Sequence, residues 1–157
     1  MNKQKIEIES KKIKLPNFKK SAILSNDVRK RFAFKENGNS YIAENTKNKI
    51  GCRLRIDGEL YTSDDGEKCD VGLLLEDSRF FLIELKGKNI QNAYKQLYET
   101  YIKLSKDYQD YCFKFYGRIV CSTGKKVKTP QALTLLQNIK KCFVTVLDHE
   151  KKFEEKV

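Results

Sequence analysis

The chain has 157 residues and a mass of 18.4 kDa, a size that suits a single domain. It holds 32 Lys and Arg against 21 Asp and Glu, a formal net charge of +11, and 39% of its residues are hydrophobic. No apolar run approaches the roughly 20 residues of a membrane-spanning helix, and the first residues lack the apolar core of a secretory signal. This composition excludes a disordered tail and a membrane protein, and it predicts a cytoplasmic protein.

The five cysteines give no sign of a zinc site or of a disulfide framework. Their number is odd, and none of them forms a C-x-x-C pair or lies at ligand spacing from the single histidine, His149. Reduced thiols in a cytosolic protein are the simpler interpretation.

The positive charge is concentrated in the first third of the chain. Residues 1–55 hold 15 Lys and Arg against 5 Asp and Glu, whereas the remaining residues are nearly neutral. Residues 57–84 form an acidic centre with nine Asp and Glu, which include Asp70 and Glu84. A basic segment favours a polyanion by displacing its counterions, but a solvated lysine-rich surface has the same composition. Charge alone therefore leaves nucleic-acid binding open.

In chain order, residues 1–20 are expected to form a basic arm or an edge strand. Ser25, Asn26 and Asp27 can cap a first helix that runs past Phe32 and Phe34 and ends at the 36–39 turn. Apolar patterns predict strands at 50–56, 69–75 and 80–86, with a turn at Asp57-Gly58 after the first of them.

The second half of the chain alternates helix and strand. A stripe at helical spacing predicts a long helix: Ile90, Ala93, Tyr94, Leu97, Tyr101, Leu104 and Tyr108. A strand is expected at 113–121, then a helix capped by Thr129 with Pro130 in its first turn, a last strand at 142–147 and a polar tail.

The order of these elements predicts an α/β (α+β) fold with a mixed central β-sheet flanked by helices. We expect one domain over residues 1–157, with a basic N-terminal extension at 1–20, a core at 21–121 and a peripheral helix and strand at 122–157.

Three charged residues end two otherwise apolar strands. Asp70 lies in the strand at 69–75, and Glu84 and Lys86 point to one face of the strand at 80–86. If the two strands pair as a hairpin in an even register, Asp70 and Glu84 lie side by side. A lone E-x-K is common on exposed strands, so the signal depends on the combination of the three.

Two adjacent carboxylates repel each other unless a cation lies between them. Hard oxygen ligands suit Mg²⁺, for which Mn²⁺ can substitute, and Mg²⁺ commonly takes one or two protein carboxylates together with substrate phosphate. A lysine beside such an ion could orient or deprotonate the attacking water, or stabilise charge on the phosphorus during in-line attack.

Asp70 followed at a distance by Glu84-Leu85-Lys86 resembles the D…(D/E)-x-K motif of the PD-(D/E)xK nuclease superfamily. The resemblance covers roughly residues 25–121 and implies a restriction-endonuclease-like core. It also implies that Asp70, Glu84 and the Leu85 carbonyl hold the metal and that Lys86 is the catalytic lysine. One departure is Cys69, which stands where the pattern has proline.

The resemblance implies further site residues with weaker support. Many members carry an acid on the first helix, for which Glu44 is the first candidate and Glu36 the second. Gln96, ten residues after Lys86, is either a contact near the site or a solvated helix residue.

The expected partner is nucleic acid, with DNA favoured over RNA, and a homodimer would allow cutting of both strands. Its contacts are expected from the basic residues Arg53, Arg55, Lys125, Lys126 and Lys128. These expectations describe a Mg²⁺-dependent DNA endonuclease of restriction, repair or mobile-element type. The alternative is a non-catalytic module of the same fold that binds nucleic acid or protein.

Overall fold

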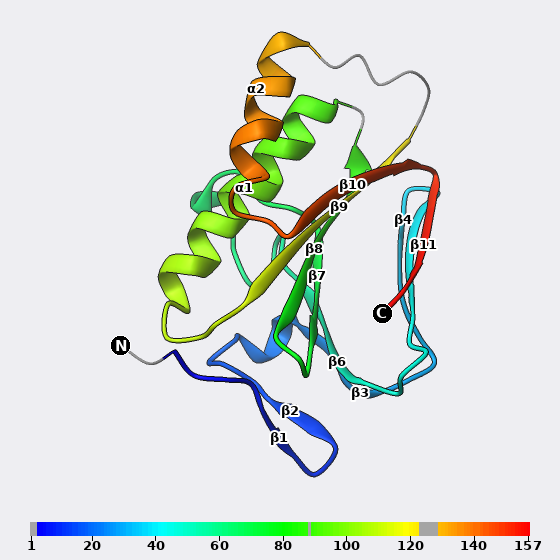
Figure 1. The fold of residues 1–157 in the computed structure, drawn as a ribbon, viewed down its shortest axis with the longest axis vertical. Helices are drawn as coiled ribbons and strands as arrows, with labels where there is room; N and C mark the ends of the chain where they lie inside the picture. Colours follow the sequence, from blue (N-terminus) through cyan, green and yellow to red (C-terminus); the bar gives the residue numbers. More distant parts are fainter. Residues whose placement is uncertain (1–2, 88, 123–128) are drawn as a thin grey trace.

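The computed structural model describes residues 3–87, 89–122 and 129–157, which form three layers (Figure 1). Helices α1 (Ile90–Asp107) and α2 (Pro130–Ile139) cover one face of a six-stranded sheet, and a three-stranded sheet covers the other face. The expected mixed α/β architecture with helices against a mixed sheet is confirmed. No helix of the described residues is long and apolar enough to cross a membrane.

The central sheet has the order β10-β9-β8-β7-β6-β3. Its strands, in that order, are Thr145–Glu150, Lys114–Cys121, Arg79–Gly87, Val71–Leu75, Ile50–Arg55 and Ile23–Val28. The pairs β3–β6, β6–β7 and β7–β8 are antiparallel, whereas β8, β9 and β10 are parallel to one another. Parallel neighbours need a crossover, and α1 and α2 supply the two crossovers on the same face of the sheet.

The sequence pattern of α1 explains how it packs. Its predicted stripe faces the sheet, where Ala93, Tyr94, Leu97 and Leu104 are buried. The Asn89 side chain caps its first turn by accepting hydrogen bonds from two backbone amides. In α2 the expected cap is also confirmed, because Thr129 Oγ1 accepts from the Ala132 amide and Pro130 opens the helix.

The smaller sheet, of order β11-β5-β4, builds a second hydrophobic core against the central sheet. Its strands, in that order, are Lys152–Lys156, Asn39–Glu44 and Arg31–Glu36. A close approach joins the two sheets, because a Cβ on Gly51 of β6 would lie 2.5 Å from the ring of Phe32. Glycine at this position therefore lets the ring pack directly on the backbone of the central sheet.

The helix predicted after Ser25 is wrong, because this segment forms strands β3 and β4. Phe32 and Phe34 are buried and alternate with exposed Arg31 and Lys35, which is the period of a strand rather than of a helix. The polar tail predicted after residue 147 is also wrong, because β10 continues to Glu150 and β11 pairs in parallel with β5.

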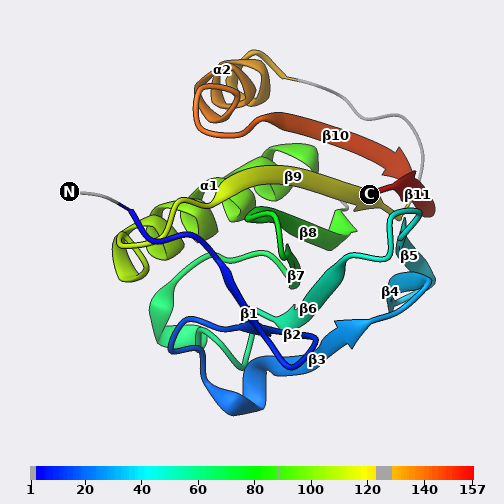
Figure 2. The ribbon, with the colours of Figure 1, turned by 60° about the horizontal axis from the view of Figure 1, so that its bottom comes forward.

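The basic N-terminal segment forms a short hairpin of β1 (Glu7–Glu9) and β2 (Lys12–Lys14). Figure 2 shows this hairpin beside β3, the edge strand of the central sheet. There the Asn26 side chain accepts from the Ile13 amide at 3.0 Å and donates to the Ile13 carbonyl at 2.8 Å. These two bonds attach the hairpin to the edge strand.

Candidate metal centre

Asp70 and Glu84 each lie one residue beyond the last residue pair of the β7–β8 hairpin. Val71 lies opposite Ile83 in that pairing, so one further step along both strands brings Asp70 opposite Glu84. The even register that the sequence analysis required is therefore confirmed. By alternation, both side chains lie on the α1 face together with Leu74.

Both acidic residues are enclosed, with Asp70 4% and Glu84 1% exposed. Aspartate and glutamate are almost never this deeply buried unless they are paired or bind a cation. The Oδ2 atom of Asp70 accepts a hydrogen bond of 2.7 Å from the Leu85 amide. This bond attaches the Asp70 carboxylate to the backbone of β8 two residues past Ile83, the last residue of β8 that pairs with β7.

A β-bulge in β8 lies within the Glu84-Leu85-Lys86 motif. Glu84 pairs with Ile119 of β9 but Gly87 pairs with Cys121, so β8 has one more residue than β9 in this interval. A bulge bends its strand and redirects the side chains beside it, and bulges are frequent next to active sites. The three-residue motif therefore departs from regular strand geometry where Asp70 approaches it.

Asn39 of β5 holds the bulge from the second sheet. It is 2% exposed, and its Nδ2 donates both to the Leu85 carbonyl and to Ser122 Oγ, the latter at 2.9 Å. The ends of β8 and β9 are thus tied to one side chain. A carbonyl oxygen has two lone pairs, and this bond uses one of those on Leu85.

Helix α1 positions the residue that precedes Asp70. The Thr100 hydroxyl, fully buried, accepts from the Cys69 amide at 2.8 Å and donates to the Gln96 carbonyl at 2.7 Å. Burial, with a further contribution from the charges of Glu84 and Asp70, holds the pKa of the Cys69 thiol well above its usual range. Cys69 is therefore a neutral, packed thiol and not a nucleophile.

The remaining candidate site residues lie at different distances from Asp70 and Glu84. Gln96 is half-buried one helical turn before Thr100, on the side of α1 that faces the start of β7. Glu44 pairs with Arg31 at 3.0 Å at the far end of β5, about 17 Å along the strand from Asn39, so the structure does not bring it to Asp70 and Glu84. Glu36, the second candidate acid, is the direct cross-strand partner of Asn39.

Two of the predicted nucleic-acid contacts, Arg53 and Arg55, lie on β6 and differ in how exposed their side chains are. The guanidinium of Arg53 is half-buried and donates to Ser25 Oγ at 3.0 Å and to the Ala33 carbonyl at 2.9 Å. Burial lowers its pKa from the usual value. Arg53 therefore joins β3, β4 and β6, whereas Arg55 is exposed.

The structure describes the backbone of Lys86 but not its side chain, and the three predicted lysines of the basic loop lie outside the described residues: Lys125, Lys126 and Lys128. Across residues 3–87, 89–122 and 129–157, no group of three or more His, Cys, Asp or Glu side chains lies close enough together to hold a metal ion. The oxygen atoms at the bulge that could bind an ion belong to Asp70, Glu84 and the Leu85 carbonyl. This set fits Mg²⁺, which keeps several waters and needs only one or two protein carboxylates.

Sequence reasoning missed Asn39 and Thr100, which support the site from two different layers. For Thr100 a signal was present, because it follows Gln96 by four residues and so shares its helix face. For Asn39 none was available, because its contact with Leu85 depends on a second sheet that was not predicted. Comparisons with protein-family models, with curated proteins and with solved structures find no match to this chain.

Proposed function

We propose that the protein is a Mg²⁺-dependent phosphodiesterase that cleaves nucleic acid, in particular a DNA endonuclease of restriction, repair or mobile-element type. The observation that carries the proposal is the pair of buried carboxylates, Asp70 and Glu84, opposed across two strands at a β-bulge. Two carboxylates side by side repel each other, so a cation between them stabilises both, and the bulge interrupts the strand at the E-x-K motif.

The fold supports the same proposal. Three antiparallel strands, β6, β7 and β8, are followed by α1 and by the parallel strand β9, with the motif residues at the start of β7 and the end of β8. This order resembles the restriction-endonuclease-like core. The first helix of that core is a departure, because β3, β4 and β5 occupy the corresponding part of the chain.

Asp70, Glu84 and the Leu85 carbonyl would hold the ion, and Mn²⁺ is expected to replace Mg²⁺. Such an ion supplies Lewis-acid stabilisation of charge on the scissile phosphate. The protein's own residues then have separate tasks. Thr100 and Asn39 fix the backbone on either side of the carboxylates, and Lys86 would orient or deprotonate the attacking water.

A second function is favoured by a specific observation. Asp70 Oδ2 and the Leu85 carbonyl already form hydrogen bonds within the fold, to the Leu85 amide and to Asn39. These bonds would serve equally well in a non-catalytic module that binds nucleic acid or protein through its basic surface. Catalysis and binding therefore have to be measured separately on the same variants.

The deciding experiment is a cleavage assay on supercoiled plasmid with Mg²⁺ or Mn²⁺, repeated on linear double-stranded DNA, single-stranded DNA and RNA. Loss of one metal-holding carboxylate is expected to lower the rate by more than about a hundredfold. We expect this loss for Asp70→Asn and Glu84→Gln, and a comparable loss for Lys86→Ala.

The matched control is Asp64→Asn, which removes an exposed carboxylate from the same acidic segment and should cleave like the wild type. Equal nicking by the wild type and by Glu84→Gln would mean that the activity arises elsewhere and would refute the site. DNA binding with no cleavage by the wild type, under any of these conditions, would favour the non-catalytic module.

A further inference from the structure

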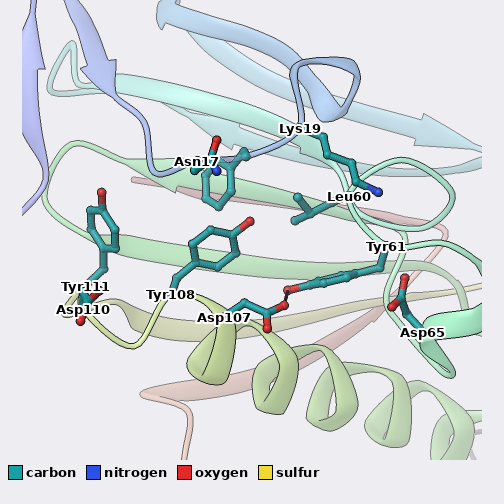
Figure 3. A pocket seen from close by; sticks show the side chains of 10 residues that line it. Asn17, Lys19, Leu60, Tyr61, Asp65, Asp107, Tyr108, Asp110 and Tyr111 are labelled. Carbon is teal, nitrogen blue, oxygen red and sulfur yellow. Dashed lines mark hydrogen bonds between the residues drawn. The ribbon is translucent and has the colours of Figure 1, made fainter.

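A pocket with no part in the proposed site lies at the C-terminal end of α1. Its volume is about 700 Å³, within the range of small-molecule sites, and Figure 3 shows its lining side chains. Asp107 is the last residue of α1. It lies about 25 Å along the helix from the first residue, Ile90, which is the end of α1 nearest Gly87. The pocket is therefore remote from the E-x-K bulge.

The walls of the pocket are aromatic and well ordered by contacts. Tyr108 packs edge-on against Phe18, with ring centroids 4.8 Å apart, and Tyr111 stacks on Phe113 at 5.5 Å. The Tyr61 hydroxyl donates to Asp107 Oδ2 at 2.8 Å, a bond drawn in Figure 3. These contacts present preformed ring surfaces to the pocket.

The charge of the pocket is unusual for this protein. Among the described residues, three aspartates line it, Asp65, Asp107 and Asp110, together with one lysine, Lys19. A second ammonium group, that of Lys103, lies 5.8 Å from the centre of the Tyr61 ring. Within the described residues, none of the three forms an ion pair, although the chain holds 32 Lys and Arg. Carboxylates and aromatic faces together stabilise an organic cation, whereas a phosphate would be repelled.

We propose that this pocket binds an extended organic cation that carries two or more alkylammonium groups. The aromatic rings receive its methylene chain and the faces of its ammonium groups, and Asp107 and Asp110 accept their hydrogen bonds. The volume exceeds what one ammonium group needs, which favours a linear polyamine over a single small cation. The same chemistry is carried by consecutive lysine side chains of a basic peptide.

The test is isothermal titration calorimetry on nucleic-acid-free protein at fixed ionic strength, with spermidine, a tetralysine peptide and tetramethylammonium as separate probes. We expect spermidine to bind and the double variant Asp107→Asn/Asp110→Asn to weaken its binding about tenfold, as the loss of charge pairs at two exposed aspartates predicts. Asp110→Asn alone should show part of the loss without any change in α1.

Asp64→Asn is the control, because it removes a neighbouring exposed charge that does not line the pocket. Tighter binding of tetralysine than of spermidine would keep the site and assign the cation to a peptide. The proposal is overturned if neither polycation binds at millimolar concentration. It is also overturned if Asp64→Asn weakens binding as much as the double variant, or if tetramethylammonium binds as well as spermidine.

Discussion

Arg118 of β9 is a cation enclosed between the two sheets, with 3% of its surface exposed. Its guanidinium donates to both carboxylate oxygens of Glu155 in β11, at 2.6 and 3.1 Å, and to Thr145 Oγ1 at 2.9 Å. The Tyr41 hydroxyl also donates to Glu155, at 2.6 Å. A buried charge is tolerated when it is paired and fully hydrogen-bonded, and this network joins β5, β9 and β11.

Replacing Arg118 by alanine should lower the free energy of unfolding by about 3 kcal/mol, because Glu155 would then be left as an uncompensated charge. Urea denaturation measures the change. The double variant Arg118→Met/Glu155→Leu should recover much of the loss, because both charges are absent. The exposed pair of Lys14 and Glu7 provides a control, since Lys14→Ala should leave the unfolding midpoint unchanged. Equal stability of Arg118→Ala and the wild type would contradict this role.

A two-residue turn, Asn37-Gly38, joins strands β4 and β5. Asn37 and Gly38 both have positive φ, 49° and 78°, which is the type I′ turn that joins antiparallel strands through two residues. The helix predicted after Ser25 also ends at this Asn-Gly pair, with Val28, Phe32 and Phe34 as its possible core contacts. The turn signal and the alternation from Arg31 to Glu36 were the stronger signals.

The contact of β4 with β6 can be tested with Gly51→Ala. The added methyl group would overlap the Phe32 ring, so we expect a loss of about 1–3 kcal/mol in the free energy of unfolding. Phe32→Leu makes room for this methyl group, but by itself it leaves a cavity that lowers the free energy of unfolding. In a double-mutant cycle, the two changes together should therefore cost less than the sum of the single changes. Strict additivity would show that Gly51 and Phe32 do not pack as described.

At the scale of the whole molecule, the basic hairpin and the acidic site are far apart. Figure 1 shows β1 and β2 at one end of the molecule and the C-terminal end of β8 toward the other. The positive charge of the sequence is concentrated in residues 1–55, whereas Asp70 and Glu84 belong to the acidic centre. The hairpin can assist binding at these two acids only by contacting a long nucleic acid at a second place.

This separation predicts different effects on binding and on catalysis. Lys11→Ala/Lys12→Ala should flatten the dependence of log affinity for duplex DNA on log salt concentration by about 2, because two phosphate contacts are lost. The cleavage rate at saturating DNA should not change. Lys140→Ala/Lys141→Ala, in exposed positions after α2, serves as the control and should flatten the slope less. An unchanged slope in the hairpin variant would exclude this surface.

The sequence predicted the β7–β8 hairpin and α1, since these depend on local periodicity and on a short turn. It predicted Asp70 beside Glu84 only on the assumption of an even register, which the strand pairing confirms. It did not predict the second sheet, because β11 reaches β5 from more than 100 residues away and its strand is short and charged. Asn39 and Arg118 depend on that sheet, so neither could be assigned from local pattern. The polar contacts around the site were thus less predictable than its two carboxylates.

The central claim is that Asp70 and Glu84 together hold a divalent ion, and anomalous diffraction from crystals soaked in Mn²⁺ tests it most directly. We expect an anomalous peak about 2.1 Å from a carboxylate oxygen of each residue, which is lost in Glu84→Gln crystals. The absence of a peak at millimolar Mn²⁺, or a peak that persists unchanged in Glu84→Gln, would contradict the claim.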